Sequence, residues 1–166
     1  MRELQLLDTS VVVELLQIPG ECARYELTAA EFEERSQPPI ELQMPVATIV
    51  EVGAHVGRIV DGYERRSCAE RFMRMVQSTV ERAAPWSFTP LDWDIAFLGE
   101  LSNPTDDRAP EIVDSLTRQF LEMGDLLIVS EFRRLRQNLD PRAVDVDVWT
   151  YDSSLRGVID ALRTHR

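Results

Sequence analysis

The sequence contains no lysine, so its 18 basic side chains are all arginines, and against 29 aspartates and glutamates they leave a formal net charge of −11. This sign argues against a broad nucleic-acid-binding surface, because phosphate binding usually draws on clustered basic residues. Local patches can still oppose the overall sign. Two groups of arginines are close in sequence, although solvated helix faces balanced by glutamates are the simpler interpretation: Arg65, Arg66, Arg71 and Arg74, then Arg133, Arg134 and Arg136.

Cysteine and histidine are equally scarce, with two of each in 166 residues. Cys22 and Cys68 have no paired spacing, which argues against a disulfide framework and against a thiolate zinc site. His55 and His165 are too few for an imidazole-rich metal centre. Any metal would therefore be held mainly by carboxylates, and such ligands favour Mg²⁺ or Mn²⁺.

Long hydrophobic runs are also absent, and none approaches the roughly 20 residues needed to cross a bilayer. Arg2 and Glu3 lead into Asp8 without the apolar core of a signal peptide, so we expect a cytoplasmic protein with no membrane segment. The length, with 44% hydrophobic and 28% charged residues, predicts a single globular domain over residues 1–166.

The stretch Leu4–Val13 opens with a short apolar run that predicts a first β-strand, and it then delivers Asp8 followed by the hydroxyls of Thr9 and Ser10. In open α/β sheets, ligands bind beyond the carboxyl ends of the strands, so an acid at this point is placed for a metal or a substrate. The alternative is that one of these three polar residues simply caps the following helix, predicted over Val11–Gln17.

Strands and helices alternate along the rest of the chain. Three more strands are predicted, over Met44–Thr48, Trp86–Leu91 and Asp145–Tyr151. Apolar residues at helical spacing predict further helices over Cys22–Arg35, Ile49–Val60, Arg66–Ala84, Trp93–Leu101, Glu111–Met123, Asp125–Leu139 and Leu155–Leu162. Because no hairpin signals separate the strands, we expect an α/β fold with three layers, α/β/α, and a parallel sheet of four strands, or five.

Three helix ends are predicted from single residues, and one loop from its composition. Thr28 is placed to cap the second half of the helix over Cys22–Arg35, and Asp92 to cap the helix that begins at Trp93. Gly124 is expected to end the helix before it as a C-cap. The segment Asn103–Pro110, with two prolines and no apolar periodicity, is predicted to be a loop.

Acidic residues recur where the predicted elements meet one edge of the sheet. Asp8 leaves the first strand, Glu51 lies early in the helix after the second, Asp125 opens a helix and Asp152 follows the last strand. Clustered carboxylates repel one another unless a cation neutralises them, so the pattern indicates a divalent-metal site suited to phosphodiester hydrolysis. Taken singly, Asp125 is also compatible with an N-cap and Glu51 with an exposed helix position.

These segments together resemble the PIN domain, whose best-known bacterial members are the VapC-type toxins of toxin–antitoxin pairs. The resemblance covers nearly the whole chain in element order and is carried by Leu6–Ser10, Val46–Glu51, Gly124–Ile128 and Val148–Asp152. It implies a ribonuclease dependent on Mg²⁺ or Mn²⁺, with RNA as the substrate and a small antitoxin protein as a partner. A second copy of the chain, forming a homodimer, is a further candidate partner.

The resemblance also assigns roles to individual residues. Asp8 and Asp125 would bind the metal most directly, and Asp152 and Glu51 would complete its shell or orient water. The hydroxyls of Thr9, Ser10 and Thr150 would support this acidic set. Asp92 and Asp114 remain competitors for the third acidic place.

Two features depart from the family pattern. Family members typically carry a further strand after the one ending at Asp152, whereas this sequence closes with a helix, so we expect Asp145–Tyr151 to be an edge strand. Asp145 and Asp147 fit that position, because charges discourage pairing with another chain. The Asn103–Pro110 loop and the extra helix before Asp125 resemble an insertion that reshapes access to the site.

Two other functions are compatible with parts of the pattern. The acidic surface and the missing strand suggest a catalytically inactive PIN-like module that binds RNA or protein. A haloacid dehalogenase-like phosphatase also begins with an acid after its first strand. Such enzymes need a second aspartate two residues later, and here that position is Ser10, which argues against this reading.

Overall fold

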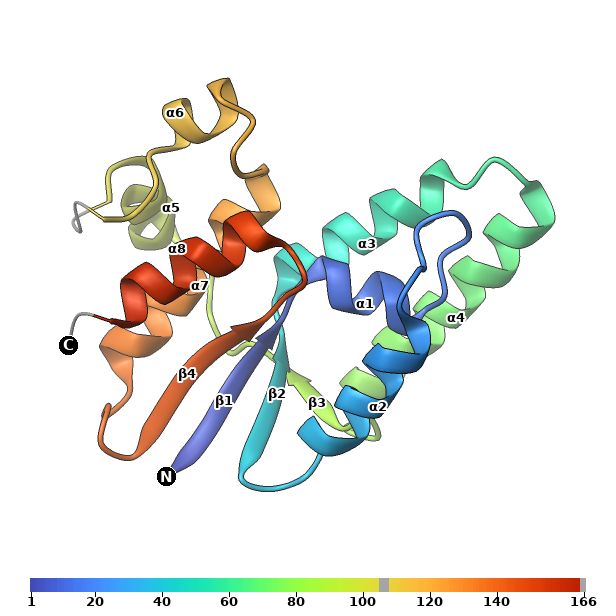
Figure 1. Cartoon of the computed structure of the whole chain (residues 1–166), viewed down its shortest axis with the longest axis horizontal. Helices are drawn as coiled ribbons and strands as arrows, with labels where there is room; N and C mark the ends of the chain where they lie inside the picture. The colour runs from blue at the N-terminus through green and yellow to red at the C-terminus, as the bar shows by residue number, and fades with distance from the viewer. Residues whose placement is uncertain (105–107, 165–166) are drawn as a thin grey trace.

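Four parallel strands form the centre of the protein in the computed structural model, which describes residues 1–104 and 108–164 (Figure 1). The strands are β1 (Arg2–Leu7), β2 (Ile40–Met44), β3 (Trp86–Phe88) and β4 (Val144–Trp149), in the order β3-β2-β1-β4 across the sheet. All three neighbouring pairs are parallel. The predicted α/β fold with a four-stranded parallel sheet is confirmed, and the described residues add no fifth strand to it.

Helices cover both faces of this sheet, which confirms the predicted three layers (Figure 1). One layer contains α1 (Thr9–Leu15), α2 (Tyr25–Arg35), α3 (Val46–Arg58) and α4 (Gly62–Val80). The other contains α5 (Ile95–Ser102), α6 (Ile112–Thr117), α7 (Met123–Asn138) and α8 (Ser153–Arg163). Within the described part of the chain, no helix combines the length and apolar character needed to cross a membrane.

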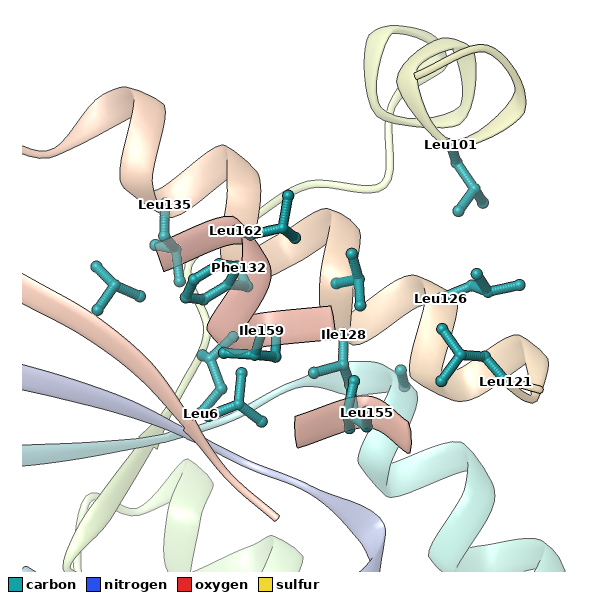
Figure 2. Packing of buried hydrophobic residues seen from close by; sticks show 14 of the residues in the cluster. Leu6, Leu101, Leu121, Leu126, Ile128, Phe132, Leu135, Leu155, Ile159 and Leu162 are labelled. Atoms are coloured by element: carbon teal, nitrogen blue, oxygen red, sulfur yellow. The ribbon is translucent and has the colours of Figure 1, made fainter. Parts of the chain in front are cut away.

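Two hydrophobic cores form because successive side chains of a strand point to opposite faces of the sheet. The first core joins Leu6 of β1 to Phe132 of α7 and Ile159 of α8, and all three side chains are fully buried (Figure 2). The second joins Leu7 of β1 to Met44 of β2 and to the helices of the opposite layer. Burial of each such side chain contributes about 1.5–3 kcal/mol, so the strand ends are held firmly between the two helical layers.

The second strand lies earlier than predicted, over Ile40–Met44 instead of Met44–Thr48. Pro45 is the extended N-cap of α3, and the residues after it form the first helical turn. There the Thr48 hydroxyl donates a hydrogen bond to the carbonyl oxygen of Leu7 at 2.8 Å. The prediction was wrong because periodicity alone does not distinguish a short β-branched run from the start of a buried helix.

Two of the predicted helix caps are also wrong. Helix α2 begins at Tyr25, and the Thr28 hydroxyl donates to the carbonyl oxygen of Arg24 one turn back, at 3.0 Å, instead of capping. Helix α5 is capped by Asp94, whose carboxylate accepts from the backbone N–H of Phe97 at 2.7 Å, and not by Asp92.

The extents of several other elements differ modestly from the prediction. The N-cap Asp61 starts α4 at Gly62, ahead of the predicted Arg66, and β3 stops at Phe88 instead of Leu91. The predicted helix over Glu111–Met123 is shorter, since α6 ends at Thr117. Part of the predicted Asn103–Pro110 loop, residues 105–107, lies outside the described residues.

Strand β4 lies at the edge of the sheet, as predicted. The acids on this edge are paired with arginines of α8. Asp145 forms an ion pair with Arg163 at 2.6 Å, and Asp147 pairs with Arg156 at 2.8 Å and with Arg163 at 2.5 Å. These ion pairs therefore hold α8 against β4. The same two acids also discourage another strand from pairing with this edge strand.

Many of the grouped arginines serve the fold directly, by binding backbone carbonyls at the ends of helices. Arg65 donates to the carbonyl of Ile59 at 2.8 Å, and Arg71 donates to that of Leu16 at 3.1 Å. Arg136 similarly binds the carbonyl of Leu162 at 2.6 Å. Arg66 pairs with Glu70 at 3.2 Å on an exposed helix face, as expected, whereas these three arginines bind backbone carbonyls instead of glutamates.

Candidate functional site

A cleft of about 530 Å³ opens at the carboxyl ends of the strands, and all four predicted acids line it. Asp8 follows β1, Glu51 lies in α3, Asp125 lies in the first turn of α7 and Asp152 follows β4. The structure thus brings together four side chains from distant parts of the sequence. Neither Asp92 nor Asp114 is among the residues that line this cleft.

Asp8 is the most deeply buried of the four, with 2% of its surface exposed. Its Oδ2 atom accepts from the Ser10 hydroxyl at 2.5 Å, from the Thr150 hydroxyl at 2.7 Å and from the Ser10 backbone N–H at 3.3 Å. The last of these bonds makes Asp8 the N-cap of α1. Burial raises the pKa of Asp8, and the hydroxyl bonds from Ser10 and Thr150 oppose that rise.

The predicted supporting hydroxyls of Ser10 and Thr150 join the ends of β1 and β4. Besides binding Asp8, the Ser10 hydroxyl accepts from the backbone N–H of Tyr151 at 3.0 Å. The Thr150 hydroxyl accepts from the backbone N–H of Asp152 at 2.9 Å. These bonds fix the two strand ends, and with them two of the four acids, relative to one another.

Glu51 is held by the third supporting hydroxyl. Its Oε2 atom accepts from the Thr9 hydroxyl at 2.6 Å, which ties α3 to the start of α1. The carboxylate lies directly against Gly124 of α7, where an added Cβ atom would overlap Glu51 Oε1. The prediction that Gly124 is the C-cap of the preceding helix is therefore wrong. Gly124 lies inside α7 and lets this helix approach the Glu51 carboxylate.

Asp125 lies next to Gly124, at the third position of α7. Its Oδ2 atom accepts from the backbone N–H of Glu122 at 2.9 Å and completes a capping box. Desolvation, together with the negative charges of Asp8, Asp152 and Glu51, raises the pKa of Asp125 to about 7. Desolvation is the largest cause of this rise, and the three neighbouring charges add to it, so Asp125 interacts electrostatically with the other carboxylates.

Asp152 is the most accessible acid of the set and caps α8. Its Oδ1 atom accepts from the backbone N–H groups of Ser154 at 2.7 Å and Leu155 at 2.8 Å. Three of the four predicted acids thus occupy a helix N-terminus, either as N-cap or inside the first turn.

Several cleft residues were not identified from the sequence. A histidine–carboxylate pair lines the cleft, formed by Nδ1 of His55 and Oε2 of Glu21. His55 lies one helical turn after Glu51, which is a spacing that the sequence displays. Arg24 and Phe120 line the cleft as well, and they reach it through packing of α2 and of the segment before α7, which no local pattern reveals.

The chemistry of the donor set fits a hard divalent cation. Oxygen ligands suit Mg²⁺ and Mn²⁺, and the raised pKa of Asp125 reflects burial first and then the negative charge of its neighbours, which a cation would neutralise. Among the described residues, however, no three acidic, histidine or cysteine side chains are grouped closely enough to hold a metal ion as they stand. The carboxylates of Asp8, Asp125 and Asp152 are each engaged in a capping bond instead.

Comparison of the chain with protein-family models, with curated proteins and with solved structures found no match. The functional interpretation therefore rests on the chemistry of the cleft.

Proposed function

We propose that the protein is a metal-dependent ribonuclease of the PIN type. The observation that carries the proposal is the convergence of Asp8, Glu51, Asp125 and Asp152, from four separate segments, in one cleft at the carboxyl edge of a parallel sheet. Such a cluster is costly to desolvate unless it serves to bind a cation.

The cleft residues have distinct parts in this proposal. Asp8, Asp125 and Asp152 would hold Mg²⁺ or Mn²⁺, and the ion supplies positive charge that stabilises a phosphodiester during hydrolysis. Glu51, held by Thr9, would orient the attacking water. Ser10 and Thr150 fix Asp8 in position through their hydroxyls.

Asp8→Asn tests the proposal with end-labelled single-stranded RNA in the presence of Mg²⁺ or Mn²⁺. We expect the wild type to cleave and the variant to lose at least about 100-fold in rate, equivalent to roughly 3 kcal/mol of transition-state stabilisation. Asp92→Asn is the matched control, because Asp92 lies outside the cleft lining and should keep full activity. A folded Asp8→Asn variant with wild-type activity would refute the mechanism.

The second candidate is an inactive PIN-like module that binds RNA or protein. It is favoured by the absence, within the described residues, of three ligands grouped closely enough for a metal. Calorimetric titration with Mn²⁺ separates the two candidates. A binding heat that depends on both Asp8 and Asp125 supports the nuclease. The absence of such a heat supports the binding module.

A toxin role within a toxin–antitoxin pair is the further part of the proposal. A small antitoxin with a basic tail is the partner whose charge would complement an acidic cleft. A neighbouring reading frame that encodes such a protein would support this role.

A further inference from the structure

The charge of the cleft is unfavourable for a polyanionic substrate. Seven acidic residues line it, namely Asp8, Glu14, Glu21, Glu51, Glu122, Asp125 and Asp152. A divalent cation would neutralise charge at the scissile phosphate, but the neighbouring phosphates of an RNA strand would still face carboxylates. Arg24 is the one arginine among the residues that line the cleft in the described part of the chain.

The backbone around Arg24 is fixed by a buried carboxylate. Glu14, which is 6% exposed, accepts from the backbone N–H of Ala23 at 3.1 Å and from that of Arg24 at 2.8 Å. Burial works to raise the pKa of Glu14, but the bonds from these two N–H groups, together with the Cys22 thiol and the charge of Arg24, outweigh it and lower the pKa. Glu14 therefore stays ionised and holds the turn that presents Arg24.

The side chain of Arg24 is held against an aromatic ring. Its guanidinium carbon lies 5.5 Å from the centroid of Tyr151, within the range of a cation–π contact. The Tyr151 hydroxyl donates to Glu31 Oε2 at 3.0 Å, and Trp149 Nε1 donates to the same atom at 3.0 Å. Tyr151 is thus fixed at its hydroxyl by Glu31 and at its backbone, because its N–H donates to the Ser10 hydroxyl.

The guanidinium of Arg24 differs from those of Arg65, Arg71 and Arg136 in what it binds. Arg65, Arg71 and Arg136 are engaged by backbone carbonyls. For the Arg24 guanidinium, the described residues provide the Tyr151 ring and a Coulombic interaction with Glu14, but no side-chain hydrogen bond or ion pair within 4 Å. Its planar fork of donors is suited to phosphate oxygens.

We propose that Arg24 binds a phosphate of the RNA strand next to the scissile one and so positions the substrate over the acidic cluster. This inference rests on the proposed nuclease function. Arg24 is a positioning residue here, and its effect should appear in substrate binding and in salt dependence more than in the chemical step.

The test compares Arg24→Ala, Arg24→Lys and Arg74→Ala in cleavage of the same single-stranded RNA, at fixed Mn²⁺ and several NaCl concentrations. Arg74 is the matched control, because it is an exposed arginine of α4 outside the cleft lining. We expect Arg24→Ala to raise KM about 10-fold or more with kcat within about 3-fold, as for loss of a charge-assisted bond. The slope of log kcat/KM against log salt should become shallower by about 0.7, the value for one phosphate contact on a single strand.

Arg24→Lys should keep the wild-type salt slope and recover part of KM, since lysine retains the charge but lacks the fork. Arg74→Ala should match the wild type. If Arg24→Ala matches Arg74→Ala in KM and salt slope while the wild type cleaves, the role of Arg24 is refuted and the nuclease function stands.

If the wild type does not cleave, the nuclease function fails, and fluorescence anisotropy with the same RNA makes the same comparison on Kd. Equal Kd values and salt slopes for Arg24→Ala and Arg74→Ala would then refute the Arg24 proposal as well. Thermal melting of each variant shows whether it is folded.

Discussion

Replacing Asp125 with Asn should stabilise the metal-free protein at pH 8. Desolvation and the charges of Asp8, Asp152 and Glu51 raise the pKa of Asp125 from 3.8 to about 7 in the folded state. The folded protein therefore binds this proton more tightly than the unfolded chain does. The associated stability is fully present below about pH 4 and is lost progressively as the pH rises to about 7.

The size of the effect follows from the shift in pKa. At about 1.4 kcal/mol per pKa unit, a change from 3.8 to about 7 corresponds to at most roughly 4 kcal/mol. The side chain is partly accessible, and solvent screening reduces this figure to about 2 kcal/mol. For a chain of this size, about 2 kcal/mol raises Tm by about 4–8 °C.

Asparagine keeps the shape of the side chain and can still accept the N–H of Glu122, so the variant removes the charge with little other change. We would measure Tm and urea unfolding in EDTA at pH 4 and pH 8. The variant should exceed the wild type at pH 8 and match it at pH 4. Added Mn²⁺ at 100 times its Kd should increase the unfolding free energy of the wild type by about 2.7 kcal/mol and raise its Tm accordingly. The Tm of the variant should rise far less.

Asp61→Asn is the matched control, because Asp61 is an exposed N-cap of α4 and asparagine caps equally well. Its stability should stay within about 0.5 kcal/mol of the wild type at both pH values. An Asp125→Asn variant that is less stable than the wild type at pH 8 would refute a destabilising charge at Asp125. The same difference in stability at pH 4 as at pH 8 would also refute it.

Two further predictions concern residues near the cleft and in the core. Gly124→Ala places a Cβ atom where Glu51 now lies, so it should displace that carboxylate from Thr9 and reduce RNA cleavage at least about 10-fold. Its Tm should change little, because the better helix propensity of alanine, worth up to about 1 kcal/mol, offsets the cost of displacing the carboxylate. Unchanged cleavage would contradict the assigned role of Glu51. Burial raises the pKa of Glu131, whose Oε1 accepts from Trp93 Nε1 at 3.0 Å. Because the folded protein favours protonated Glu131, the free energy of unfolding falls as the pH rises and this carboxyl ionises. Glu131→Gln should therefore narrow the difference in unfolding free energy between pH 5 and pH 9. An unchanged difference would show that Glu131 does not contribute to the pH dependence of stability.

The sequence predicted the layers of the fold well where its signals were local and strong. The alternating strand at Asp145–Tyr151 and the amphipathic helix that closes the chain both correspond to observed elements, β4 and α8. The second strand was misplaced, because the β-branched run after Pro45 suits a strand and a buried helix turn equally well. Tertiary packing favours the helix there, because in the helical conformation the Thr48 hydroxyl donates to the carbonyl oxygen of Leu7 at the end of β1.

The cleft was predictable only in part, and for a physical reason. Asp8 and Asp152 follow strands, so topology alone places them on one edge. Arg24 reaches the same cleft because Glu14 holds its backbone and Tyr151 its side chain, and both contacts depend on how α1, α2 and β4 pack. No spacing in the sequence encodes such a contact.

Capping and clustering, which appeared from the sequence to be alternatives for each acid, arise from the same geometry. Asp8 and Asp152 cap α1 and α8, and Asp125 belongs to the capping box of α7. Helices that begin at the carboxyl edge of a parallel sheet direct their N–H groups and the positive ends of their dipoles toward that edge. Carboxylates that satisfy those N–H groups are brought together by necessity, and the dipoles of α7 and α8 offset part of their repulsion. Burial is the largest cause of the raised pKa of Asp125, and the negative charges of Asp8, Asp152 and Glu51 add repulsion that a bound cation would relieve.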